Sequence, residues 1–193
     1  MQRGLRSTVI RAPLIAAALL AGCTSPEHDK RPPEPVEVTG TVNSLSFPPQ
    51  VGAYLRGKAY MFQPGKLNYS IDYGRFDADL QNAVRLFFYP RARRMDEQFG
   101  AEKLSVLRAH PGATLVGEKR TLLWKNGYSY EAFMATFQWE GMFADREQRI
   151  SSQLILIALP DRSVMVWSSA PIAQAASAQA SLLELLERID WAY

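Results

Sequence analysis

Hydrophobic and polar positions alternate in several short stretches of the chain, and this alternation predicts β-strands. In residues 67–73 every second side chain is apolar and those between are polar, which is typical of a strand with one buried face. Residues 83–89 are rich in aromatic and branched side chains until Pro90 stops the run. An earlier strand is expected over residues 54–63, with Pro64-Gly65 as the turn that follows it.

Two hairpins are predicted further along the chain. Residues 114–124 and 128–139 flank Asn126-Gly127, the strongest short-range hairpin signal, because both turn positions need a positive φ. Residues 152–159 and 163–169 form a second pair around Pro160-Asp161-Arg162. Strands joined by such short turns are antiparallel, and several of these strands are apolar on both faces. The sheet therefore needs cover on both sides.

Apolar residues at helical spacing predict two helices that can cover the faces of the sheet. A helix is expected over residues 96–109, with Asp96 capping its first turn and with Phe99, Val106 and Leu107 on one face. A second helix is expected over residues 172–189. Its apolar face, and the aromatic residues expected to pack against its end, are Leu182, Leu185, Leu186, Ile189, Trp191 and Tyr193.

This order of elements predicts an α+β sandwich, in which an antiparallel sheet of about six or seven strands is covered by two helices, one on each face. The order resembles the PsbP-like fold, which is found in some bacterial envelope lipoproteins. The resemblance covers most of residues 51–193. It implies a PsbP-like sandwich with a role in binding or assembly more than in catalysis.

The first 22 residues have the pattern of an export signal. Arg3, Arg6 and Arg11 supply positive charge with no acidic residue beside them, and residues 14–21 are apolar throughout. That run is much shorter than the roughly 20 apolar residues that a membrane-spanning helix needs. Residues 1–22 are therefore predicted to be a signal peptide.

A four-residue motif ends this segment. Leu20-Ala21-Gly22-Cys23 resembles the lipobox of bacterial lipoproteins at every position. The resemblance implies that the Cys23 thiol is acylated, that the chain is cut before it, and that the protein's first partner is the membrane. The next residue is Thr24 rather than Asp, which by the same resemblance favours the outer membrane, with the domain facing the periplasm. The alternative is an ordinary secretory signal with a chance cysteine.

The segment after the cysteine differs in composition from the rest. Residues 23–50 hold six of the 12 prolines together with mixed charges, which is typical of a semi-extended tether. Residues 51–193 then have the size of a single globular domain with its own core.

Removal of the signal peptide changes the charge balance. The full chain has 22 Lys and Arg against 19 Asp and Glu, a net charge of +3. The signal contributes three arginines and no acid, so the mature side chains balance at 19 against 19. The charge therefore gives no support for nucleic acid as a partner.

Catalytic chemistry is sparse in the sequence. His28 falls in the tether, and His110 stands at a helix end, where the helix dipole explains it. Two separated histidines and one acylated cysteine leave no zinc site, and no metal or other cofactor is expected. Neither a Gly-x-Ser-x-Gly elbow nor a glycine-rich phosphate loop is present. We expect no catalytic residues; a triad assembled from distant segments is the enzymatic alternative.

Two groups of residues form a candidate contact patch. Arg91, Arg93 and Arg94 precede a helix start, where basic residues do not suit the dipole. They are either a surface for anionic lipid or an acidic partner, or a solvated loop partly neutralised by Asp96 and Glu97, which we favour.

The second group consists of Trp139, Met142 and Phe143, which surround a glycine beyond the end of a predicted strand. These side chains form either a contact surface or a cover over the core.

Two functions follow. The first is a noncatalytic, membrane-anchored envelope lipoprotein that binds another envelope component, and it rests on the anchor, the tether and the lack of catalytic groups. The second is a small-molecule or lipid carrier or sensor with an apolar pocket between sheet and helix. It rests on the aromatic residues of the strands, which a packed core explains more simply. Those residues are Tyr69, Phe87, Phe88, Phe133 and Phe137.

Overall fold

The computed structural model describes residues 36–37, 47–62, 68–91 and 94–192, which all lie within the unit Pro33–Tyr193. The predicted signal peptide with its lipobox, the turn at Pro64-Gly65, Arg93 and Tyr193 lie outside the described residues. In the described part, no helix has the length and apolar character that a membrane crossing requires.

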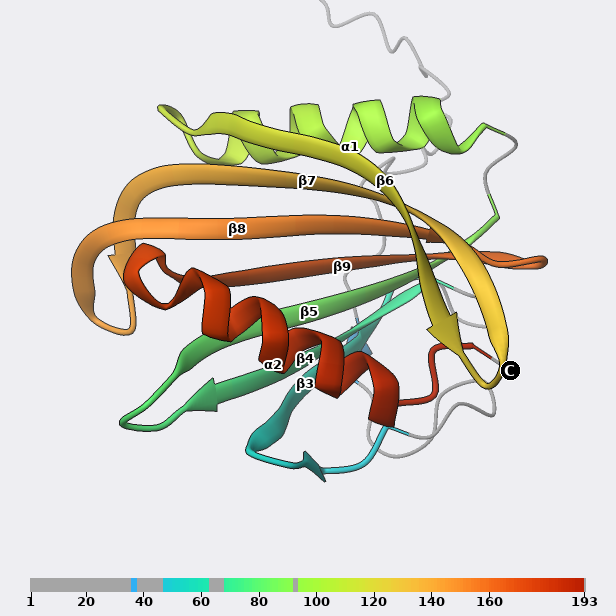
Figure 1. Ribbon diagram of the computed structural model, residues 1–193, viewed down its shortest axis with the longest axis horizontal. Helices are drawn as coiled ribbons and strands as arrows, with labels where there is room; N and C mark the ends of the chain where they lie inside the picture. Colours follow the sequence, from blue (N-terminus) through green and yellow to red (C-terminus); the bar gives the residue numbers. More distant parts are fainter. Residues whose placement is uncertain (1–35, 38–46, 63–67, 92–93, 193) are drawn as a thin grey trace, which may run out of the picture. The chain divides into compact units, whose positions relative to one another are not determined.

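Within the described residues the fold is α+β, with one antiparallel sheet and two α-helices (Figure 1). The elements in chain order are β1 (Val36–Glu37), β2 (Gln50–Val51), β3 (Tyr54–Met61), β4 (Tyr69–Phe76), β5 (Gln81–Pro90), α1 (Met95–Ala109), β6 (Thr114–Lys125), β7 (Tyr128–Phe143), β8 (Arg146–Ala158), β9 (Arg162–Pro171), a 3-10 turn (Ile172–Gln174) and α2 (Ala175–Arg188). The order of strands across the sheet is β1-β3-β4-β5-β9-β8-β7-β6, and β2 pairs with β3.

The predicted count of six or seven strands was too low, because the described residues already form nine strands of the sheet. Seven strands coincide with the predicted ones. The two additional strands, β1 and β2, are two residues long each. A strand of that length cannot show an alternating pattern. β1 and the first residue of β2 also lie in residues 23–50, whose prolines predicted a tether.

Two tight turns join neighbouring strands of the sheet, and only one of them was predicted from the sequence. Asn126 and Gly127 have φ of 54° and 81°, as the predicted hairpin between β6 and β7 requires. A further tight turn at Ala144 and Asp145, with φ of 49° and 61°, joins β7 to β8. This turn was not predicted: the strand before it was expected to end at residue 139 and the strand after it to begin at residue 152. Trp139, Met142 and Phe143 therefore lie within β7 rather than beyond a strand end.

Two details of α1 differ from the prediction. Its N-cap is Arg94, which makes no capping hydrogen bond, and Asp96 accepts a hydrogen bond from Arg94 (2.9 Å) instead of capping the helix. Phe99 and Val106 are buried as predicted, whereas Leu107 is 37% exposed. The physical reason is that α1 contacts the sheet along a narrow stripe, which leaves the flank that carries Leu107 in solvent.

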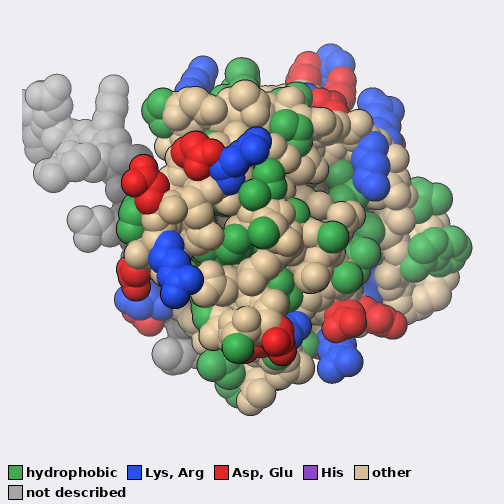
Figure 2. All heavy atoms as spheres, turned by 60° about the vertical axis from the view of Figure 1, so that its left-hand side comes forward, with side chains coloured by type: hydrophobic (Ala, Val, Ile, Leu, Met, Phe, Trp, Pro, Cys, Tyr) green, Lys and Arg blue, Asp and Glu red, His purple; other side chains and the backbone are tan. Residues whose placement is uncertain are grey.

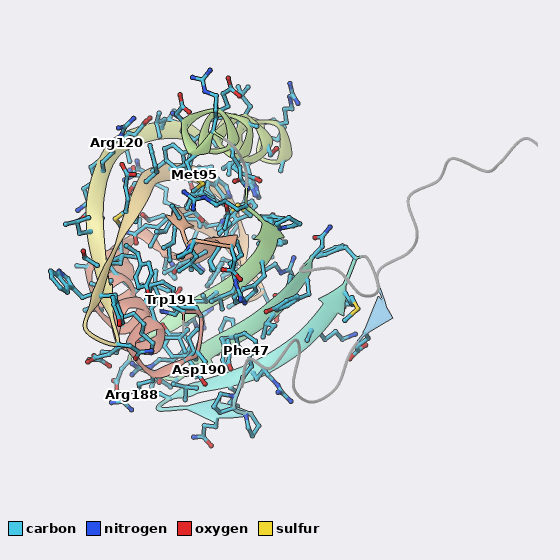
Figure 3. The ribbon with its side chains drawn as sticks, turned by 90° about the vertical axis from the view of Figure 1, so that its right-hand side faces the viewer. Phe47, Met95, Arg120, Arg188, Asp190 and Trp191 are labelled. Carbon is cyan, nitrogen blue, oxygen red and sulfur yellow. The ribbon has the colours of Figure 1, made fainter. Side chains whose placement is uncertain are left out.

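The helices lie on opposite faces of the sheet. On one face, α2 buries Leu182, Leu185 and Leu186 against the alternate residues of the central strands. The core on this side also takes in Phe47, from before β2, and Trp191, from beyond α2 (Figure 3). Phe47 is 3% exposed, so the packed core includes a residue on the tether side of the boundary expected at residue 51.

On the other face, α1 packs over β7, β8 and β9. Phe99 and Val106 from the helix meet Phe133, Leu156 and Met165 of the sheet. The strands β3 and β4 contribute no residue to this second core. The face of the sheet opposite α2 is therefore covered over only part of its width.

Candidate functional site

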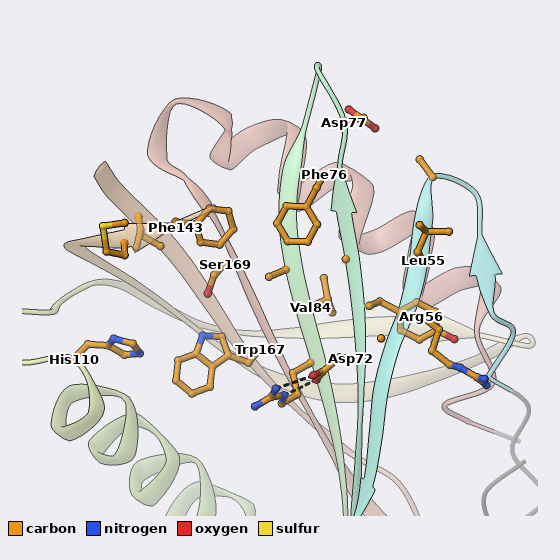
Figure 4. A pocket seen from close by; sticks show the side chains of 18 of the residues that line it. Leu55, Arg56, Asp72, Phe76, Asp77, Val84, His110, Phe143, Trp167 and Ser169 are labelled. Atoms are coloured by element: carbon orange, nitrogen blue, oxygen red, sulfur yellow. Dashed lines mark hydrogen bonds and ion pairs between the residues drawn. The ribbon is translucent and has the colours of Figure 1, made fainter. Parts of the chain in front are cut away.

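An open cleft of about 860 Å³ occupies the part of the sheet that α1 leaves uncovered (Figure 4). With 15 residues, α1 is about 22 Å long, whereas the 16 residues of β7 extend for about 50 Å. The helix ends at His110, and this residue lines the cleft together with residues of β3, β4, β5, β7, β8 and β9. The cleft exists because the helix is too short to cover these long strands.

Small side chains form the floor of the cleft. Gly74, Ala83 and Ser169 are cross-strand neighbours on β4, β5 and β9, and all three line the cleft. A β-carbon at position 74 would lie 2.5 Å from Cε2 of Phe76, so glycine there lets the Phe76 ring lie close against the strand. The floor stays open because its alternate positions carry little or no side chain.

Aromatic side chains form one end of the cleft. The rings of Phe76, at the end of β4, and Phe143, at the end of β7, lie 6.2 Å apart between their centroids. Near them, Met142 is 67% exposed and Phe76 is 59% exposed. Apolar side chains this exposed at the mouth of a cleft are typical of a binding surface. On the face shown in Figure 2, hydrophobic side chains gather over the middle and most charged side chains lie toward the rim.

A ring stack forms the wall beside α1. The His110 imidazole stacks on Trp139 with 4.1 Å between centroids and meets the edge of Trp167 at 5.7 Å. The indole N–H of Trp167 donates to the hydroxyl of Ser152 (3.3 Å), which is hydrogen-bonded to Ser169. These contacts hold both indoles in fixed orientations. Burial lowers the pKa of His110, so the imidazole is neutral at neutral pH.

One ion pair lines the cleft where β4 and β5 are paired. Asp72 and Arg85 are cross-strand neighbours on β4 and β5 and form a bidentate pair, with 2.7 Å between Nη2 and Oδ2 (Figure 4). Hydrogen bonding to Asp72 raises the pKa of the Arg85 guanidinium. The two charges cancel, so the pair adds polarity to the cleft without net charge.

The candidate contact patch is divided by the fold. Trp139, Met142 and Phe143 all line the cleft. Arg91 lies at the end of β5 that pairs with the start of β9, and it donates to the carbonyl of Pro160 (3.0 Å). The strand registers place that end of the sheet opposite to the β7–β8 turn. The two groups therefore do not form one surface.

The arginine group itself is partly neutralised. Arg94 forms ion pairs with Asp96 (2.9 Å) and Glu97 (2.7 Å). The charge of Arg94 is therefore balanced locally, while Arg93 lies outside the described residues.

The aromatic residues that suggested a pocket belong to the cores. Tyr69, Phe88 and Phe137 are fully buried, and Phe133 is 6% exposed. The cleft is instead lined by Phe76, Trp139, Phe143 and Trp167 from the strand ends, and by His110. The sequence feature that could have indicated the cleft is a set of small residues on the same face of the sheet as Asp72. These residues are Gly57, Gly74 and Ala83.

No protein-family model matches the chain. No curated protein matches it either. Among solved structures, the protein of unknown function PA94 from Pseudomonas aeruginosa is similar with a TM-score of 0.45 and 11% identity, over 68% of this chain and 89% of that one. The Ran-binding protein Mog1p from Saccharomyces cerevisiae is similar with a TM-score of 0.37 and 16% identity, over 68% of this chain and 79% of that one. At these scores neither likeness bears on function.

Proposed function

We propose that the protein is a noncatalytic, membrane-anchored envelope lipoprotein whose folded domain binds a small apolar ligand in the cleft. The cleft is the observation that supports ligand binding. Its volume of about 860 Å³ lies within the range of roughly 300–1,000 Å³ of small-molecule sites. Its lining combines apolar and aromatic side chains with a few polar groups, as such sites do.

A noncatalytic role is supported by the surroundings of His110. Its ring contacts are with Trp139 and Trp167, and in the described part of the chain it makes no hydrogen bond to a carboxylate or hydroxyl. A general base in a triad needs such partners on both ring nitrogens. The described residues also contain no cluster of three or more His, Cys, Asp or Glu that could hold a metal.

Binding of an apolar fluorescent probe tests the cleft. We expect N-phenyl-naphthylamine to bind the full mature chain at one saturable site. Ala83→Phe places a ring at the centre of the floor and should weaken this binding at least tenfold. Leu183→Phe on α2, which is exposed and does not line the cleft, is the matched control and should bind as the wild type does. Equal binding by Ala83→Phe and wild type would exclude the cleft as the site.

The anchor is supported by the resemblance of residues 20–23 to the lipobox, and by the same resemblance Thr24 favours the outer membrane. Mass spectrometry of the mature N-terminus should find acylated Cys23, and Cys23→Ser should release an intact domain from the membrane fraction. Unmodified Cys23 in a cleaved, membrane-free protein would contradict the anchor. The PsbP-like sandwich stays a proposal for the fold family, supported by the order of elements.

A second candidate function is binding of another envelope protein along β6. This strand is the last in the sheet, and it exposes Leu115, Val116, Leu122 and Trp124 by 44–69%. A long edge strand with exposed apolar side chains can pair with a strand of a partner. A photoreactive side chain at position 122 should then trap one dominant protein in cells, whereas the same group at position 183 on α2 should not.

A further inference from the structure

The chain enters the sheet at one end of its strands. β1 pairs antiparallel with the last residues of β3, Val36 with Met61 and Glu37 with Tyr60. Val36 therefore lies at the end of the sheet where β3 finishes. It follows Cys23 by 13 positions, which span at most about 45 Å when fully extended. An acyl group on Cys23 would keep this end of the sheet within that distance of the bilayer.

The same end of the sheet carries the hairpin between β6 and β7. Neighbouring strands alternate in direction, so the end of β5, the start of β9, the end of β8, the start of β7 and the end of β6 all lie at this end, to the right in Figure 1. Trp124 and Tyr128 flank the turn at residues 126–127 and are 69% and 65% exposed. Trp124 pairs with Ser129 and Tyr128 with Lys125, so the two rings lie on opposite faces of the hairpin, close to its tip.

The chemistry of these two rings favours a lipid surface. Neither ring belongs to the cores of the described residues. Trp and Tyr are enriched at the interfaces of a bilayer, because each combines an apolar ring with a polar group that reaches water or headgroups. A protein that packs on one face of the hairpin covers only Trp124 or only Tyr128. Lipids surround an inserted tip and contact both.

A positively charged side chain adjoins the hairpin. A hollow of about 640 Å³ at this end of the sheet is lined by Arg91, by Tyr128 and by the β8–β9 turn at Pro160. Arg91 is exposed, and its Nη1 donates to the carbonyl of Pro160 (3.0 Å). Its other donors remain for a lipid phosphate, which guanidinium groups bind well.

The nearest acids do not cancel this charge. Glu131 also lines the hollow, and it pairs with Arg120 (4.0 Å). Asp161, in the β8–β9 turn, pairs with Arg162 (2.7 Å). Arg91 makes no ion pair with a carboxylate of the described residues. The hollow therefore keeps one positive charge beside an exposed aromatic ring.

We propose that this end of the sheet docks on the bilayer, with Trp124 and Tyr128 at the depth of the lipid headgroups and Arg91 at a lipid phosphate. This inference rests on the proposed anchor at Cys23, which holds the domain close enough for weak contacts to form. The mouth of the cleft, with Phe76 at the end of β4, lies at the other end of the strands. Docking would therefore leave the cleft open to the periplasm.

Quenching of tryptophan emission by brominated lipid tests the docking. The acylated mature chain is reconstituted into vesicles of phosphatidylethanolamine and phosphatidylglycerol, with or without bromine on the acyl chains. Trp124 should lose emission in the brominated vesicles. Trp124→Phe removes this reporter and keeps an apolar ring. The difference between the two proteins separates Trp124 from Trp139 and Trp167, which lipid bound in the cleft would also quench.

A reporter at the other end of β6 is the matched control. Leu115 is 44% exposed, does not line the cleft and lies about 30 Å from Trp124 along the strand. Leu115→Trp is made in the Trp124→Phe background. The emission that it adds should not be lost in brominated vesicles.

Variants of the contact residues test which groups hold the hairpin on the lipid. Tyr128→Ser should reduce the quenching of Trp124, because the tip loses one of its two rings. Met142→Ser is matched to it, since Met142 is 67% exposed at the other end of β7, and should leave the quenching unchanged. Arg91→Gln should also reduce the quenching, as should replacement of phosphatidylglycerol by phosphatidylcholine.

Each other outcome counts against a different statement. An acylated, vesicle-bound protein whose Trp124 is quenched no more than the tryptophan at position 115 would overturn the docking and leave the anchor standing. Equal quenching in wild type and Tyr128→Ser would overturn the role of Tyr128. Trp124 that is shielded from acrylamide in native membranes but unquenched in lipid vesicles would assign the hairpin to a protein partner instead. A chain without an acyl group that stays off the vesicles would overturn the anchor, and the docking with it.

Discussion

The two faces of the sheet carry helices of nearly equal length, 15 residues in α1 and 14 in α2, yet only one face is closed. On the α2 face, Phe47 and the segment from Ile189 to Ala192 extend the cover beyond the helix. On the α1 face no segment of the described residues continues the cover past His110, and the cleft opens there. Segments outside regular secondary structure thus decide which face is closed.

Removal of side chains from the two faces should affect stability very differently. Phe47 is 3% exposed, with its ring centroid 5.4 Å from that of Phe88. Phe47→Ala should lower the free energy of unfolding by about 3–5 kcal/mol, as for other buried phenylalanines. Phe76→Ala, at the mouth of the cleft, should cost less than about 1 kcal/mol, because this ring is 59% exposed. Urea unfolding of both variants provides the test, and equal losses would contradict the difference between the faces.

Features of the fold that depend on neighbouring residues could be predicted from the sequence, and features that depend on tertiary packing could not. The hairpin at Asn126-Gly127 has a strong local signal, and the buried stripe of Leu182, Leu185 and Leu186 repeats at helical spacing. The turn at Ala144-Asp145 carries no glycine, so it gives no comparable signal. The cleft depends on the length of α1 relative to the strands, and the closure of the α2 face depends on where Phe47 and Trp191 fold. Both are tertiary properties.

A smaller effect is expected from the ion pair in the cleft. Asp72→Asn removes the bidentate contact with Arg85, whose side chain is 50% exposed. The loss of stability should be roughly 0.5–1 kcal/mol, since solvent screens pairs of this kind. Measurements at low and high salt should show the difference from wild type shrinking as salt rises. A loss that does not change with salt would indicate that packing, rather than charge, is what the variant removes.

The smallest effect is expected from His110. Burial places its pKa below the ordinary value of 6.5, so the unfolded chain takes up the proton first as pH falls. Stability should therefore be unaffected by this group above that value and should decline as pH falls from 6.5 through the lowered pKa. His110→Gln should remove this part of the decline. Unfolding midpoints measured across acid pH give the comparison, and an identical decline in both proteins would contradict the buried, neutral imidazole.

The four tryptophans allow the most direct test of ligand binding in the cleft. Trp139 and Trp167 line the cleft, Trp191 is buried on the α2 face, and Trp124 is exposed on β6. Their indole N–H signals can be followed by NMR while N-phenyl-naphthylamine is added to saturation. The account predicts that the signals of Trp139 and Trp167 shift while those of Trp124 and Trp191 stay in place. Shifts confined to Trp124 or Trp191 would contradict it.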